Sequence, residues 1–73
     1  MEKRYYVRAI WDSEASVWTS QTDIPGLVIE ANTLAEFESL IEELAPEMLV
    51  ANTGVEPRGV SVHFSAERQL ALA

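Results

Sequence analysis

The fold is decided by one stretch near the middle of the chain, DIPGLVIEANTLAEF (residues 23–37). Proline presets the first central torsion of a type II turn, and glycine accepts the positive torsion at the next position, so Pro25-Gly26 predicts a tight turn. Thr33 and Glu36 match a capping box, in which each side chain satisfies a free backbone N–H of the other. The stretch therefore predicts a turn, a short strand over 27–31, and a helix that begins at Thr33.

Apolar side chains then recur at intervals of three and four, as on the buried side of a helix. The predicted apolar stripe is Leu34, Phe37, Ile41, Leu44 and Met48, with Leu40 beside it. The opposite, solvated face is acidic and carries Glu36, Glu38, Glu42, Glu43 and Glu47. Pro46 cannot donate a hydrogen bond to the carbonyl of Glu42, which predicts a kink or a restart there. Gly54 is expected to be a left-handed cap.

Two strands are predicted before this stretch and one after the helix. The first, Arg4 to Trp11, is expected to face the core with Tyr5, Val7, Ala9 and Trp11. Turn residues at 12–14 lead to a second strand, Ala15 to Gln21, in which either Val17 with Thr19 or Trp18 faces inward. Val60, Val62 and Phe64 alternate with polar residues as a fourth strand. The tail, 65–73, could continue this strand, start a helical turn or pack on a neighbour through Leu70 and Leu72.

The expected fold class is therefore α+β, with elements in the order strand, strand, strand, helix, strand. The first three strands form an antiparallel meander, and the helix crosses over so that the fourth strand lies parallel to the first, in the sheet order 3-2-1-4. The helix covers one face. The other face is predicted to be unusually apolar for an open sheet and to need a partial cover, and its residues are Tyr6, Arg8, Ile10, Val28, Glu30, Ser61 and His63, with Trp18 in one of the two registers.

Length and composition limit the function. The 73 residues, 1–73, are expected to form a single domain, because two would not fit into 8.1 kDa. The chain has no cysteine, which excludes disulfides, thiolate zinc sites and thiol chemistry. The net charge of -7 argues against direct binding of nucleic acid. No apolar run resembles a signal peptide or a membrane span, so a cytoplasmic location is expected.

The charges are unevenly placed. Residues 9–57 contain no Lys or Arg but hold ten of the twelve acids. The chain has a single histidine, His63, and its helical glutamates are expected to point to solvent, so no catalytic residue, metal site or cofactor is predicted. Asp12, Glu14 and Asp23 at strand ends raise the alternative of a magnesium-dependent nuclease. They are more typical of turn residues that bond to their own backbone.

Several segments together resemble the small HicB-like antitoxin domains. They are YVRAIWD (6–12), ASVW (15–18), DIPGLVIEA (23–31) and TLAEF (33–37), about two-thirds of the chain. The resemblance is to the short branch of that group, with a partial RNase H-like sheet. It implies a non-catalytic protein that binds and neutralises a small basic RNA-cleaving toxin of the HicA kind, and that forms a homodimer or higher homo-oligomer. Longer HicB antitoxins add a C-terminal DNA-binding module, and none is expected here.

Two surfaces are predicted to bind protein. One is the outer sheet face with Tyr6, Arg8, Ile10 and His63, to which Trp18 could add an anchor, and the other is the acidic helix face with Glu38, Glu42 and Glu43. The alternative is a homo-oligomeric interaction module that has no toxin partner.

Overall fold

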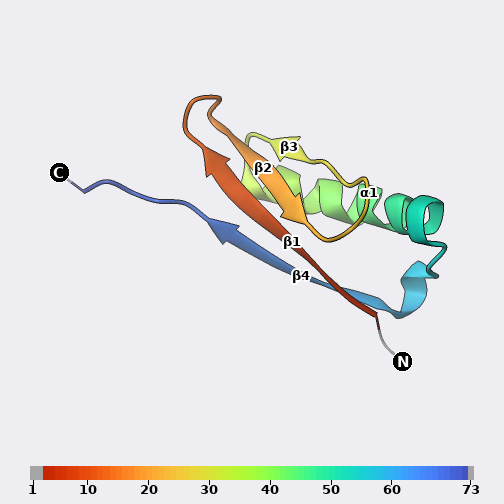
Figure 1. Cartoon of the computed structure of the whole chain (residues 1–73). Coiled ribbons are helices and arrows are strands. Elements are labelled where there is room, and N and C mark those ends of the chain that lie inside the picture. Colours follow the sequence, from red (N-terminus) through yellow and green to blue (C-terminus); the bar gives the residue numbers. More distant parts are fainter. Residues whose placement is uncertain (1–2, 73) are drawn as a thin grey trace.

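Four strands form one sheet in the order β3-β2-β1-β4, and the helix α1 lies against one face of it (Figure 1). The computed structural model describes residues 3–72. The elements are β1 (Lys3–Asp12), β2 (Val17–Thr22), β3 (Glu30–Ala31), α1 (Leu34–Thr53), a 3-10 turn η1 (Pro57–Gly59) and β4 (Val60–Glu67). β1 pairs antiparallel with β2 and parallel with β4, and β2 pairs antiparallel with β3. The predicted fold class and strand order are confirmed.

The hairpin between β1 and β2 is set by Asp12. Its Oδ1 accepts hydrogen bonds from the backbone N–H groups of Glu14 at 3.0 Å and Ala15 at 3.2 Å. Ser16 adopts a left-handed conformation, with φ of 57°, and its N–H donates to the carbonyl of Asp12. The carboxylate thus supplies the turn chemistry that the sequence predicts.

The third strand is shorter than predicted, because only Glu30 and Ala31 of residues 27–31 form regular β3. The carbonyl of Ile29 still accepts from the N–H of Ser20, but the N–H of Ile29 donates to the hydroxyl of Ser20 at 2.9 Å. A side chain thus takes the place of a backbone acceptor, and the regular ladder stops. Before it lies the predicted turn, in which the N–H of Leu27 donates to the carbonyl of Ile24 and Gly26 has φ of 81°.

Both predicted ends of the helix are confirmed. The Thr33 hydroxyl accepts from the N–H of Glu36 at 3.1 Å, and Gly54 closes the helix in the left-handed conformation with φ of 69°. A restart at Pro46 was the wrong prediction, since α1 runs through it as one helix. Ala45 and Leu49 are buried on either side of Pro46. Their packing on the sheet keeps both turns helical despite the lost backbone bond.

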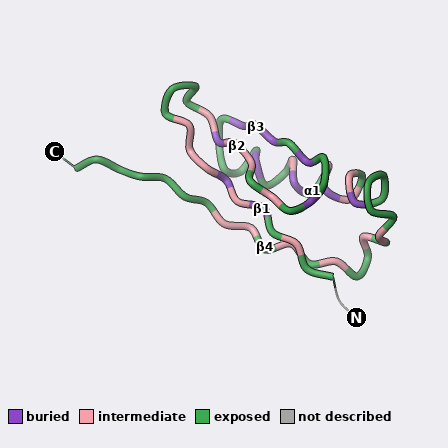
Figure 2. The backbone as a smooth tube through the Cα atoms, in the orientation of Figure 1, coloured by how far each residue is buried: buried purple, intermediate pink, exposed green. Residues whose placement is uncertain are grey.

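The core lies between α1 and the inner sheet face, shown as the purple stretches of Figure 2. Trp18 belongs to it, which decides the register of β2, and its ring meets Trp11 edge-on with centroids 5.2 Å apart. The helix buries the four-residue series Phe37, Ile41, Ala45 and Leu49, so the predicted stripe is wrong at Leu34, which is 37% exposed, and only partly correct at Leu44 and Met48. The side of α1 that faces the sheet therefore carries every fourth residue, and not the mixed spacing of three and four that the stripe assumed. The sheet contributes Val7, Ala9, Trp18 and Ala31, and the turn segment contributes Ile24, Leu27 and Ile29.

The turn at Gly26 also holds the end of the helix, and this generates a prediction. Asn52 Nδ2 donates to the carbonyl of Pro25 at 2.8 Å, and a Cβ built on Gly26 would lie 2.6 Å from that same nitrogen. Gly26→Ala should therefore lose about 2 kcal/mol of unfolding free energy, because it adds strain at positive φ and displaces Asn52. Urea denaturation followed by circular dichroism measures the loss.

Gly59→Ala is the matched control, because nothing lies within 4 Å of a Cβ there and Gly59 has no positive φ. It should change stability by no more than about 0.5 kcal/mol. Similar losses in the two variants would show that the turn does not hold the helix end.

Candidate functional site

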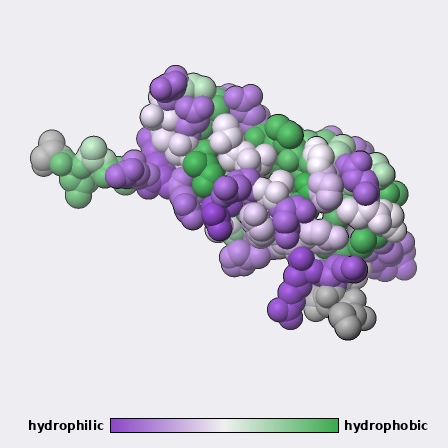
Figure 3. Space-filling model, in the orientation of Figure 1, coloured by the Kyte–Doolittle hydropathy of each residue, from purple (hydrophilic) through white to green (hydrophobic). Residues whose placement is uncertain are grey.

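The outer sheet face is the side of the sheet away from α1. Tyr6, Arg8 and Ile10 alternate with the buried Val7 and Ala9 along β1, so they point to this face. His63 of β4 lies in register beside Tyr6 and is exposed. Four predicted residues therefore share one surface. Figure 3 views the molecule from this side and shows scattered hydrophobic patches between hydrophilic ones.

Arg8 organises the centre of this face through contacts with its own chain. Its Nη1 donates to Gln21 Oε1 at 2.8 Å, its Nε lies 3.5 Å from Glu67 Oε1, and its guanidinium carbon is 5.7 Å from the Tyr6 ring centre. The three contacts join β2, β1 and β4 across the sheet. Ile10 is half-buried beside them. The centre of the face is thus a group of polar side chains joined by a hydrogen bond and an ion pair, and it is more polar than the sequence pattern predicts.

Trp18 does not belong to this surface. It is 8% exposed and lies in the core. The prediction that it anchors a partner on the outer face needs the other register of β2, which the pairing of Trp18 with Trp11 and Ala31 excludes. Its face is the one that α1 covers.

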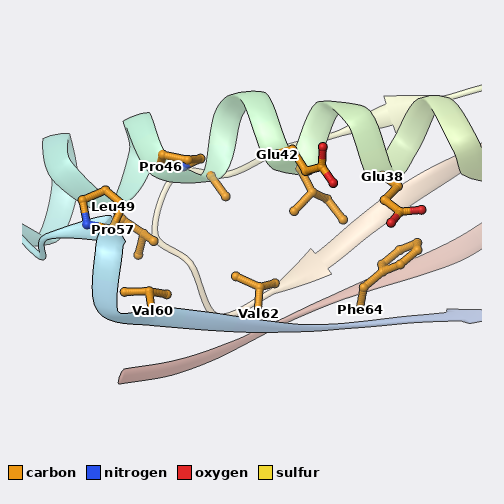
Figure 4. Close-up of a pocket in the computed structure, with 10 residues that line it drawn as sticks. Glu38, Glu42, Pro46, Leu49, Pro57, Val60, Val62 and Phe64 are labelled. Atoms are coloured by element: carbon orange, nitrogen blue, oxygen red, sulfur yellow. The ribbon is translucent and has the colours of Figure 1, made fainter. Parts of the chain in front are cut away.

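The three predicted helix acids are exposed but are not equivalent. Glu38 and Glu42 stand one residue beyond the buried Phe37 and Ile41, and both line the space between α1 and β4 (Figure 4). Glu43 lies on the solvent side of the helix, since it is 120° or more from each of the buried residues Phe37, Ile41, Ala45 and Leu49 at about 100° per residue. The structure therefore brings Glu38 and Glu42 together with β4, and leaves Glu43 apart.

Between them, α1 and β4 form an apolar groove of about 300 Å³ that sequence reasoning missed. We call it the β4 groove, and its lining residues are Glu38, Ile41, Glu42, Ala45, Pro46, Leu49, Pro57, Val60, Val62 and Phe64. Four strands spaced about 4.8 Å apart are wider than one helix of about 10 Å. α1 lies over β3 and β1, so the inner side chains of β4 stay half-buried. The prediction of four strands and only one helix could have indicated this groove, because one helix is too narrow to cover the whole sheet.

The remaining candidates are structural. Asp12 caps its own turn. Asp23 Oδ1 accepts from the backbone N–H of Tyr6 at 2.9 Å, which continues the hydrogen bonding between β1 and this chain segment beyond Thr22. Among residues 3–72, no three His, Asp or Glu side chains lie close enough together to hold a metal ion. Within the same range, α1 is too polar to cross a membrane.

Substitution by lysine tests which face of the sheet is which. Ile41 is 7% exposed and packs in the core, so Ile41→Lys should cost more than about 3 kcal/mol and unfold this small domain. Ile10→Lys places its charge on the outer face and should cost no more than about 1 kcal/mol. Thermal unfolding followed by circular dichroism separates the two. Equal, severe losses would mean that Ile10 faces a core.

Comparison with known proteins shows a family but no activity. Residues 4–73 match the family model described as Domain of unknown function (DUF1902). A crystal structure of a hypothetical protein from the extremely thermophilic bacterium Thermus thermophilus is 35% identical, with a TM-score of 0.80 over 96% of this chain and 100% of that one. No curated protein matches the chain. The matched stretch spans nearly the whole sequence, and the chain belongs to the DUF1902 family.

Proposed function

We propose that this protein is a non-catalytic antitoxin-like protein of the cytoplasm that binds and neutralises a small basic RNA-cleaving toxin. The observation that carries the proposal is the placement of charge. All five glutamates of α1 are exposed, and α1 contains no basic residue. A net charge of -7 on 73 residues is thus presented largely on the helix and the loops.

The chemistry of the partner makes this charge useful. An enzyme that cleaves RNA needs a positive surface to hold phosphates, and an acidic protein competes for that surface. Complementary charge mainly speeds the encounter and selects the partner, while a few buried side chains supply affinity. We assign the first role to Glu38, Glu42 and Glu43, and the second to the outer sheet face with Tyr6, Arg8, Ile10 and His63.

The arrangement of titratable groups supports a role in binding. His63 is exposed on the outer face beside Tyr6, and Asp12 and Asp23 are each engaged in backbone hydrogen bonds. General acid–base chemistry needs such groups to converge on one point. Among residues 3–72, the carboxylates lie instead along the helix, at separate turns and, for Glu30 and Glu67, on two different strands.

A matched pair of charge variants tests the proposal. The test partner is the product of any small basic reading frame that lies beside this gene, and its cleavage of RNA is measured with increasing amounts of the acidic protein. The double variant Glu38→Gln, Glu42→Gln should slow association roughly tenfold at low salt, because it removes two charges from the proposed contact. Glu14→Gln, Glu56→Gln changes the net charge equally at exposed loop positions outside the contact and should slow it less than about twofold.

Unchanged cleavage of RNA in the presence of excess unmodified protein would refute the toxin proposal. Equal effects of the two double variants would refute the assigned surface, because net charge alone would then explain the association rate.

The second candidate is a homo-oligomeric interaction module without a toxin. It is favoured by the open β4 groove together with two exposed leucines in the tail. Absence of a small basic gene beside this one, with a dimer detected by light scattering, would support this candidate over the toxin proposal.

A further inference from the structure

The tail beyond β4 is an extended segment that leaves the body of the domain (Figures 1 and 2). It gives the molecule extents of 48 × 20 × 18 Å and a radius of gyration of 13.3 Å, against about 11 Å for a compact domain of this length. Leu70 is 68% exposed and Leu72 is 92% exposed. Ala73 lies outside the described residues. The tail therefore holds two large apolar side chains in water.

The same chain also has an apolar surface that lacks a cover. β4 is the last strand of the sheet, so the backbone N–H and C=O groups of its outer edge have no strand beside them. The β4 groove runs along the inner side of this edge (Figure 4). An exposed edge beside an apolar groove is suited to the addition of another strand.

Alternation along the chain puts the two leucines on the groove side. Val60, Val62 and Phe64 point toward α1, and successive side chains of an extended chain alternate between faces. The guanidinium of Arg68 lies 4.2 Å from the ring centre of Trp11, a residue packed on the core, so the alternation continues past the end of β4. Leu70 and Leu72 follow Arg68 by two and four residues, so they point to the same face as Arg68, Phe64 and Val62.

The tail cannot reach its own groove, because it starts at the far end of β4 and runs away from it. We propose that two copies pair antiparallel along β4, so that the tail of each copy fills the β4 groove of the other. Directly opposite residues of an antiparallel pair share a face. With Ala66 on the two-fold axis, Leu70 lies opposite Val62, and Leu72 lies opposite Val60.

Neighbouring registers are less favourable. If the pairing partner of each residue moves by one position, Leu70 and Leu72 lie opposite residues whose side chains point to the other face of the sheet. A shift of the axis to Glu67 sets two like charges opposite each other, and a shift to Ser65 moves Leu72 beyond the start of β4. The charges agree with the Ala66 register, since the groove is lined by Glu38 and Glu42 and the only charge of residues 68–72 is Arg68.

The pairing joins two sheets into one of eight strands with both helices on the same side. It involves only copies of this chain, so it holds whether or not a toxin exists, and it specifies how the second candidate function would be built. It leaves the outer sheet face and Glu43 open to a partner, while Glu38 and Glu42 come to lie beside the tail of the other copy.

Sedimentation velocity of the purified full chain tests the tail. The unmodified protein should be a dimer, and Leu70→Asp should raise the dimer dissociation constant at least about tenfold, since it places a charge in an apolar groove near two glutamates. Val28→Asp is the matched control, because Val28 is 81% exposed and lies at the opposite edge of the sheet, and it should change the constant less than about twofold. A monomer at all concentrations, or equal effects of the two variants, would overturn the proposal.

Cross-linking tests the register, because the natural chain has no cysteine. Ala66→Cys should form a disulfide-linked dimer under mild oxidation, since the two Cβ atoms would face each other about 5 Å apart. Ser61→Cys on the same exposed strand should not, because its symmetry mate lies ten residues along the pair, about 33 Å away. Linkage at 61 as efficient as at 66, or none at 66, would overturn the pairing.

Discussion

One helix has to supply the second layer for four strands, and most features of the molecule follow from this constraint. The helix lies over β3 and β1, where the series Phe37, Ile41, Ala45 and Leu49 closes the core. β4 is tied to β1 by parallel pairing and so occupies an edge that the helix does not cover. The groove, the half-buried side chains of β4 and its free backbone edge have this single origin. A small domain has too little chain for a second helix to fill the gap.

The elements that local chemistry determines could be predicted from the sequence. Pro25-Gly26, the Thr33 cap and Gly54 each act through torsions or hydrogen bonds of near neighbours, and all three are confirmed. The strand order also followed, since short loops force antiparallel neighbours and one helical crossover sets the fourth strand parallel. The errors depend on contacts between distant residues. The shortened β3 results from the Ser20 hydroxyl on another strand, and the continuous helix at Pro46 results from packing on the sheet.

The candidate surfaces also have some features that local patterns predict and others that depend on contacts between distant residues. Alternation along β1 and β4 correctly placed Tyr6, Arg8, Ile10 and His63 on one face, and the helical period correctly left the glutamates exposed. The period could not tell which glutamates face β4, because that depends on the lateral position of the helix over the sheet. Trp18 fits a core or a surface equally well by composition, and only the pairing with Trp11 decides between them.

Trp11 also has a consequence for how the protein can be observed. Its ring contacts the ring of Trp18 and also the guanidinium of Arg68, which is at the start of the tail. Both indoles of the chain therefore sit where the tail leaves the sheet. Indole emission responds to nearby charge and to water, so the ultraviolet fluorescence of the unlabelled protein is a built-in signal for the position of its last residues.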